Sequence, residues 1–219
     1  MNFRKPITGF LLIITSIIIV SCGGSTRDQD SNILKMLKIG NQIWMAENLI
    51  VSHFRNGDLI PEARSSEEWI RMGYEGKPAW CTEQNDPDNK NKQGKLYNWY
   101  AVNDPRGLAP KGWHVSSDEE WTQITDFLGG EVLAAMNLRT NGSTKKSSEN
   151  IGSGFSGIPA GGRNNTGEFY GNGSLAMWWT ATEVNESDAW LRLLNYVQCN
   201  IYTLYYNKVY GFSVRCIRD

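Results

Sequence analysis

Apolar residues follow a helical spacing in the first half of the chain and a strand-like spacing in the second half. One face of the segment 117–128 carries Trp121, Ile124, Thr125 and Leu128. These intervals match the period of an amphipathic helix, and the Gly129-Gly130 pair that follows is typical of a helix end. We therefore predict a helix over residues 117–128 and further helical turns over residues 131–137.

Two serine-rich segments mark helix starts. Residues 65–69 read Ser-Ser-Glu-Glu-Trp, and residues 116–121 read Ser-Ser-Asp-Glu-Glu-Trp. A serine followed three residues later by a glutamate can form a capping box, as Ser65 does with Glu68. We predict a short helix from the first segment, ending near Gly73. The second segment is predicted to begin the longer helix described above.

The strands are predicted from short β-rich runs. Two apolar runs, 36–39 and 42–45, flank Gly40-Asn41 and predict a hairpin. The segment 95–103 is compatible with helix or strand, and the spacing of its aromatic residues favours helix. In the second half, turn residues separate β-rich runs at 155–160, 167–170, 177–182, 189–196, 200–206 and 212–217. The fold class is therefore α+β, with helices in the first half and a mainly antiparallel sheet in the second.

The N-terminus has the pattern of a secretory leader. Two basic residues precede a mostly apolar run from Ile7 to Val20, which is shorter than the roughly 20 residues needed to cross a bilayer. The position of Cys22, directly after Val20-Ser21, resembles a bacterial lipobox. A plain signal peptide is the alternative. We predict that residues 1–21 are the signal peptide, residues 22–34 the lipidated Cys22 and a flexible tether, and residues 35–219 a single domain.

Charge limits the partners of the mature chain. Arg4 and Lys5 fall in the predicted leader, which leaves 20 basic and 23 acidic side chains and a formal net charge of −3. This net charge indicates no basic surface that would bind nucleic acid or an anionic membrane. The lipid is therefore the expected membrane link, and the predicted location is the bacterial cell envelope, at the outer membrane or cell surface.

Three cysteines remain in the predicted domain: Cys81, Cys199 and Cys216. None of them forms a C-x-x-C pair, so zinc is not supported. In an oxidising compartment any two of the three can form a disulfide, and the sequence does not choose among the pairings. Buried thiols without a bridge are the alternative.

Five motifs carry a resemblance to a known family. They are NQIWMAENL at 41–49, GKLYNWY at 94–100, the segment 112–121, WWTATE at 178–183 and GFSVRC at 211–216. In this order, over residues 37–219, the sequence resembles the Fibrobacter succinogenes major paralogous domain family, whose members are secreted or lipid-anchored bacterial proteins. More remotely, the corner at Trp121 and the closing strand are similar to the C-type lectin-like fold shared with formylglycine-generating enzymes. The family's cysteine before the Gly-Trp-His corner is absent here, which leaves the partner of Cys216 open.

Acidic and imidazole groups give little support for catalysis. In a first helical turn, the carboxylates of residues 118–120 stabilise the helix dipole, so capping explains them without an active site. His53 and His114 are the only two histidines of the sequence, too few for a His-rich metal site. We expect no catalytic residues, and we expect His114 to be a hydrogen-bonded structural histidine.

One loop offers oxygen donors for calcium. Asp86, Asp88 and Asn89, together with two preceding amides, are the candidate ligands. The EF-hand spacing is absent, and Asp and Asn are also common in turns for local reasons. The expectation is no cofactor, with calcium as the alternative.

A second loop offers candidates for ligand binding. They are Arg163, Asn164, Asn165, Tyr170, Asn172, Trp178 and Trp179. Aromatic faces and amide side chains can stack on a sugar or peptide and hydrogen-bond to it in a concave site. Adjacent residues of a strand point to opposite faces, however, so at least one of Trp178 and Trp179 is expected in the core.

These observations favour a non-catalytic, surface-displayed binding or adhesion module for a glycan or protein ligand. The alternative is a structural envelope component that packs against a neighbouring protein. A third hypothesis is an oxidase similar to formylglycine-generating enzymes, in which Cys199 and Cys216 would have to form a reactive pair.

Overall fold

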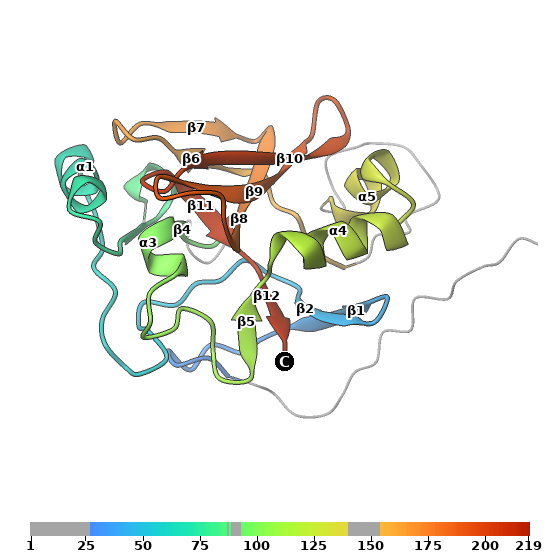
Figure 1. Cartoon of the computed structure of the whole chain (residues 1–219), viewed down its shortest axis with the longest axis horizontal. Helices are drawn as coiled ribbons and strands as arrows, with labels where there is room; N and C mark the ends of the chain where they lie inside the picture. The colour runs from blue at the N-terminus through green and yellow to red at the C-terminus, as the bar shows by residue number, and fades with distance from the viewer. Residues whose placement is uncertain (1–26, 87, 89–92, 140–153) are drawn as a thin grey trace, which may run out of the picture.

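The computed structural model describes residues 27–86, 88, 93–139 and 154–219. Their order and pairing give a mixed α+β fold, in which four α-helices lie in the first two thirds of the chain and strands dominate the last third (Figure 1). The predicted fold class is therefore confirmed at the level of α+β. Within the described residues, no helix is long and apolar enough to span a membrane.

A small four-stranded sheet contains both ends of the described chain. Its order is β1 (Met36–Ile39), β2 (Gln42–Met45), β12 (Cys216–Arg218) and β5 (Trp113–Val115). β1 and β2 form the predicted hairpin, with Leu37 opposite Trp44 and Gly40 at a positive φ of 59° in the turn. Glycine enters this left-handed region at little cost, which explains Gly40.

A larger, mainly antiparallel sheet forms the opposite side of the molecule. Its order is β10 (Asn200–Asn207), β9 (Asp188–Asn195), β8 (Leu175–Glu183), β6 (Ala160–Arg163), β11 (Gly211–Val214), β4 (Leu96–Asn98) and β3 (Trp80–Cys81), with β7 (Phe169–Asn172) paired to β6. β8 pairs in parallel with β6 and β11, and the other pairs are antiparallel. Figure 1 shows the two sheets at opposite ends of the view.

The helices begin where the serine motifs predict. α1 (Ser66–Tyr74) starts after Ser65, whose side chain accepts a hydrogen bond from the N–H of Glu68. α4 (Asp118–Phe127) starts after Ser117, which forms a full capping box with Glu120. α3 (Trp99–Val102) and α5 (Glu131–Leu138) are shorter, and a 3-10 turn, η1 (Glu83–Asn85), follows β3. Local cap chemistry therefore determined these boundaries.

Three predicted elements differ from the structure. The expected strand at 155–160 is wrong, because the strand of this region, β6, begins only at Ala160. The expected helix at 95–103 divides into β4 and α3, since the side chain of Asn98 accepts from the N–H of Ala101 and caps a new helix. The expected strand at 212–217 divides at Arg215, where the chain passes from the large sheet to the small one.

The ordered structure begins earlier than predicted. Residues 27–34, placed in the tether by their polar composition, form a turn against the domain, and we call them the N-terminal segment. Arg27 and Ile33 form an antiparallel bridge. The buried Asp28 accepts hydrogen bonds from the N–H groups of Asp30 and Asn32, each at 2.9 Å. Asp and Asn form such turns as readily as they form linkers, so composition could not separate the two.

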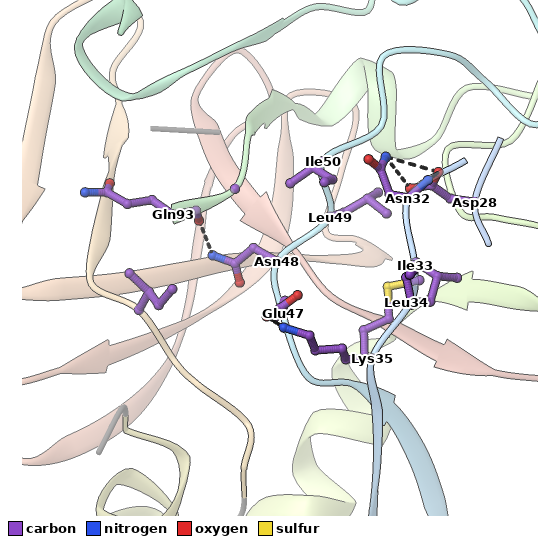
Figure 2. Close-up of a pocket in the computed structure, with 13 residues that line it drawn as sticks. Asp28, Asn32, Ile33, Leu34, Lys35, Glu47, Asn48, Leu49, Ile50 and Gln93 are labelled. Carbon is purple, nitrogen blue, oxygen red and sulfur yellow. Dashed lines mark hydrogen bonds and ion pairs between the residues drawn. The ribbon is translucent and has the colours of Figure 1, made fainter. Parts of the chain in front are cut away.

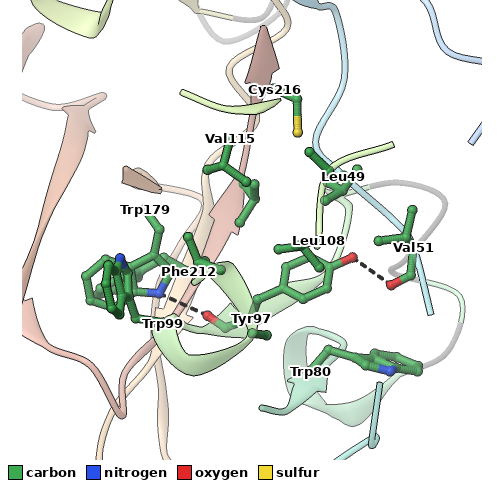
Figure 3. Packing of buried hydrophobic residues seen from close by; sticks show 14 of the residues in the cluster. Leu49, Val51, Trp80, Tyr97, Trp99, Leu108, Val115, Trp179, Phe212 and Cys216 are labelled. Carbon is green, nitrogen blue, oxygen red and sulfur yellow. Dashed lines mark hydrogen bonds between the residues drawn. The ribbon is translucent and has the colours of Figure 1, made fainter. Parts of the chain in front are cut away.

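Aromatic side chains fill two buried clusters. In one, Tyr97 donates from its hydroxyl to the carbonyl of Val51 at 2.8 Å, and Trp179 donates to the carbonyl of Tyr97 at 3.0 Å (Figure 3). In the other, the rings of Trp121 and Trp44 meet edge to face, with centroids 4.9 Å apart. Each polar group of these aromatic residues has a partner, which allows their full burial.

Candidate functional site

Arg163, a predicted ligand-binding residue, is fully buried. Its Nε donates to the carbonyl of Gly167 at 3.0 Å, and Nη1 donates to the carbonyl of Ala63 at 2.9 Å. The guanidinium also lies over the rings of Trp69 and Phe169, 4.9 and 4.8 Å from their centroids. The ligand-binding role predicted for Arg163 is corrected, because this side chain holds α1 against β6 and β7 and has no exposed surface.

Trp178 and Trp179 are both in the core, which corrects their predicted role as ligand-binding residues. Trp178 donates to the side-chain oxygen of Asn48 at 2.9 Å, and Trp179 donates to the backbone of Tyr97. The two rings point to opposite faces of β8 and enter different clusters. The alternation rule correctly placed one of them inside. The second is also buried because structure covers both faces of β8.

Asn164 and Asn165 belong to a tight turn. The side-chain oxygen of Asn164 accepts from the N–H groups of Thr166 and Glu168, each at 2.9 Å. Asn165 is exposed at the tip of the same turn. These amides therefore shape the loop between β6 and β7.

Tyr170 and Asn172 remain at the surface, on β7. Asn172 is exposed, whereas Tyr170 is half-buried and packs against the large cluster. The hydroxyl of Tyr170 has no hydrogen-bond partner among the described residues although the oxygen itself is buried. A buried polar group without a partner costs free energy, so it needs an explanation.

Three further tyrosines lie on the same side of the molecule. Tyr202 and Tyr206 project from one face of β10, and Tyr210 follows in the turn to β11; all three are half-buried against the same cluster as Tyr170. The ring centroids of Tyr206 and Tyr210 lie 5.2 Å apart. We call these residues, with Tyr170, the tyrosine face. β7 and β10 both lie at the upper edge of Figure 1.

The pKa of Tyr170 responds to the phenols of Tyr206 and Tyr210. Burial raises the pKa of Tyr170 well above its ordinary value of 10.0, and the neighbouring phenols of Tyr206 and Tyr210 raise it further. Tyr170 is therefore a neutral phenol at physiological pH, able to donate one hydrogen bond and to accept others. Tyr205, between the two face residues of β10, points to the opposite side and is 58% exposed next to Trp190.

The predicted calcium loop is only partly described. Asp86 and Asp88 are exposed, and Asp86 accepts a hydrogen bond from the N–H of Asp88 at 3.0 Å, as in an ordinary turn. Asn89 lies outside the described residues. Among the residues that the structure describes, no group of three or more His, Cys, Asp or Glu side chains is arranged to hold a metal ion.

The three cysteines of the described chain are unbridged. Burial raises the pKa of the Cys81 thiol to about 12. It also raises the pKa of the Cys216 thiol. Cys199 is half-buried in the turn between β9 and β10 and lies 3.4 Å from Nη1 of Arg139. Cys199 and Cys216 pack against different clusters, so the reactive pair that the oxidase hypothesis needs is not formed.

Comparison with known proteins identifies the family. A family model described as the Fibrobacter succinogenes major domain matches residues 37–218. The chain belongs to this family. No curated protein and no solved structure matches the chain, so the more remote C-type lectin-like fold stays a prediction. The part of the chain that matches the Fibrobacter succinogenes major domain contains all four residues of the tyrosine face. It begins after the N-terminal segment.

A small cavity of the family domain lies between the N-terminal segment and β2. It has a volume of about 130 Å³, and its lining includes Lys35, Glu47, Asn48 and Gln93 (Figure 2). Asn48 donates to the carbonyl of Gln93 at 2.7 Å. Ligand pockets usually enclose roughly 300–1,000 Å³. The cavity is therefore smaller than a usual ligand pocket.

His114, on β5, links α4 to the C-terminal residue, as a structural histidine would. Nε2 lies 2.8 Å from Glu120 and Nδ1 lies 2.8 Å from Asp219. Because the two carboxylates contact different ring nitrogens, they cannot share one metal ion with this imidazole. Partial burial lowers the pKa of His114, but the bonds to Asp219 and Glu120 outweigh it, and the net shift raises the pKa above its ordinary value of 6.5.

This raised pKa predicts a pH-dependent stability. The contribution of protonated His114 should be fully present below about pH 6.5, the unfolded value, and should be lost as the pH rises through the folded-state pKa. Thermal unfolding should therefore show a midpoint that falls across this window. The fall should be smaller in His114→Gln and should persist in His53→Gln, which removes the other imidazole. An NMR titration that placed the pKa of His114 below 6.5 would contradict the interpretation.

Proposed function

We propose that this protein is a lipid-anchored, non-catalytic binding module of the bacterial envelope, and that its tyrosine face binds a glycan. The observation that carries the proposal is the buried hydroxyl of Tyr170, which has no partner in the described structure. It lies among tyrosine rings that are themselves only half-buried. A ligand that displaces the side chains over this hydroxyl would supply the missing partner.

The chemistry of the tyrosine face fits a sugar better than a charged ligand. The four residues that define it are uncharged. Two neutral side chains add polar groups: the Tyr202 hydroxyl donates to the side-chain oxygen of Gln198 at 2.7 Å, and Asn172 is exposed on β7. Tyrosine combines an apolar ring with a polar tip. A glycan matches this combination, because a sugar ring has apolar C–H faces and hydroxyl groups at its edge.

The anchor is supported by the leader and by Cys22. The cysteine follows an apolar run and the residues Val20-Ser21, the order expected for acylation. Stable attachment to a bilayer takes more than one acyl chain, which a diacylated or triacylated cysteine provides. The predicted mature sequence has no excess of basic side chains, which agrees with attachment by lipid alone.

The non-catalytic part of the proposal rests on the chemistry of the described side chains. The thiols of Cys81 and Cys216 are buried, and burial raises the pKa of each, which suppresses the reactive thiolate. In α4, the carboxylate of Glu120 forms the capping box and contacts His114, and that of Asp118 pairs with Arg192. None of these groups lies on the tyrosine face.

A second candidate function, a structural envelope component, is favoured by a different surface. Four apolar side chains of α4 and α5 are each at least half exposed: Phe127, Val132, Leu133 and Met136. Contiguous exposed apolar residues are typical of protein contacts. Crosslinking in intact cells that recovered one stoichiometric protein partner through α5 would favour this function over glycan binding.

Substitution of Tyr170 by phenylalanine tests the glycan proposal. Tyr170→Phe should weaken binding by roughly three- to tenfold, the value of one hydrogen bond, in isothermal titration with a ligand found on a glycan array. The same variant should have an unchanged or higher thermal midpoint without ligand, because it removes an unpaired buried hydroxyl. Tyr206→Ala should abolish most binding by removing a stacking ring.

Tyr205→Ala is the matched control. It removes a tyrosine from the same strand but from the opposite side, so binding should be unchanged. A glycan array without any ligand, or equal affinities for the Tyr170, Tyr205 and Tyr206 variants, would contradict a glycan site on the tyrosine face.

A further inference from the structure

The N-terminal segment is fastened to one end of the domain. Nε2 of Gln29 donates to the carbonyls of His53 and Leu108 at 2.7 and 3.3 Å. The carboxylate of Asp30 accepts from the N–H of Ser52 and contacts Nδ1 of His53. The point at which the chain leaves the domain toward Cys22 is therefore fixed beside the loop 52–54.

The distance from this point to the proposed anchor is short. Only residues 23–26 lie between Cys22 and the N-terminal segment, so five Cα–Cα steps separate Cys22 from Arg27. Five fully extended residues span at most about 17 Å. A domain of this size has a diameter of roughly 40 Å, estimated from the usual scaling of its radius of gyration. The tether is thus too short to let the far end of the domain approach the bilayer.

Two large apolar side chains are exposed at the fastened end. Ile33 belongs to the N-terminal segment and is 56% exposed; Leu59 is 64% exposed and pairs with His53, the partner of Asp30. Both arginines of this surface bond to backbone carbonyls: Arg27 donates to Ser31, and Arg55 donates to Ala109 and Trp113. Arg106 lies 2.8 Å from Asp104 and 3.4 Å from Asp58. Apolar contact is therefore the interaction that this surface offers.

The tyrosine face lies at the other end of the molecule. In Figure 1 the first described residues, in blue, lie at the bottom, and β7 and β10 lie at the top. Because a projection can only shorten a distance, the two surfaces are at least as far apart in the molecule as they are in this view. A bilayer at the fastened end would thus leave the tyrosine face directed into the medium.

We infer that the surface formed by residues 27–34 and 53–59 lies against the lipid bilayer, with Ile33 and Leu59 in contact with lipid. This orientation rests on the proposed acylation of Cys22. It holds the glycan-binding surface away from the membrane. Because the proposed contact is apolar, a phosphatidylcholine bilayer, which has no net charge, is the partner to test.

Spin labels on the full lipidated protein test this orientation. Ile33→Cys, Leu59→Cys and the control Val197→Cys, 83% exposed in the turn between β9 and β10, would each be labelled in a Cys199→Ser background. Cys81 and Cys216 are buried and should not react. In phosphatidylcholine vesicles, the ratio of collision with oxygen to collision with a water-soluble nickel chelate should rise several-fold at residues 33 and 59. It should not rise at residue 197.

The unlipidated Cys22→Ala protein provides the baseline and should not bind the vesicles. If mass spectrometry finds no acyl chains on the mature protein, the anchor and this orientation both fail. If the protein is acylated but residues 33 and 59 behave like residue 197, the orientation alone is wrong. In the Cys22→Ala protein without vesicles, nickel access at residues 33 and 59 could be lower than at residue 197. A second copy of the chain would then cover this surface, and the lipid contact would also be wrong.

Discussion

Replacement of Arg215 by methionine is expected to lower the free energy of unfolding by about 4 kcal/mol or more, a large share of the roughly 5–15 kcal/mol of an ordinary domain. Arg215 is fully buried and crosses from the large sheet to the small one. Its guanidinium donates to the side-chain oxygen of Asn48 at 2.7 Å and to the carbonyls of Met45, Phe155 and Ser156 at 3.0, 2.6 and 2.7 Å.

Methionine would leave these acceptors without their donor. Each buried acceptor that loses its partner costs about 1–3 kcal/mol, and backbone carbonyls cannot be substituted away. Burial lowers the pKa of Arg215 to about 9, so the side chain still carries its charge at neutral pH. The cation also lies 4.2 Å from the centroid of Phe155, a contact that methionine cannot reproduce.

Arg218→Met is the matched control for this prediction. Arg218 lies three residues further along, in β12, but its side chain is exposed, so its loss should change stability by no more than about 0.5 kcal/mol. Chemical denaturation followed by tryptophan fluorescence would measure both variants. Similar stabilities for Arg215→Met and Arg218→Met would show that the carbonyls of the core do not depend on this guanidinium.

Replacement of Trp121 by alanine is expected to cost about 3–5 kcal/mol. The ring is fully buried in α4 and contacts three aromatic neighbours, with centroids 4.9 Å from Trp44, 5.6 Å from Phe155 and 5.3 Å from Trp178. Its Nε1 donates to the hydroxyl of Ser116 at 2.8 Å. Alanine would open a large cavity at the junction of both sheets and leave this hydroxyl without its donor.

Phe127→Ala provides the comparison on the same helix. Phe127 is 53% exposed, so its removal should cost no more than about 1 kcal/mol. Trp121→Phe should recover part of the loss because it keeps an aromatic ring but not the hydrogen bond. Thermal and urea unfolding would rank the three variants. Equal losses for Trp121→Ala and Phe127→Ala would contradict the central position of Trp121.

These two residues explain what the family motifs do in this chain. Asn48 of the first motif, Trp178 of the fourth and Arg215 of the fifth meet at one buried amide oxygen, the Oδ1 of Asn48. Trp121, from the third motif, packs on Trp178. The motifs that identify the family therefore build the scaffold, and the proposed ligand face lies outside them.

The candidate site shows where sequence reasoning reached its limit. Tyr170 and Asn172 were predicted and lie at the surface, whereas Arg163, Trp178 and Trp179 were predicted and lie inside. The sequence does not place Tyr206, because a tyrosine in a strand can face the core or the solvent. Alternation along β10 separates Tyr206 from Tyr205 but does not say which of them joins Tyr170.

Local chemistry in the sequence determined several features of this protein. The turn at Gly40-Asn41, the caps at Ser65 and Ser117 and the division into a helical and a strand-rich half depend on residues within a few positions of one another, so a linear reading suffices. Burial depends on partners that are distant along the chain. Only the tertiary structure decided that Arg163 and Arg215 serve the core, that residues 27–34 pack on the domain, and that Tyr170 lies near Tyr206 and Tyr210. Strands and loops that are distant along the chain bring these groups together.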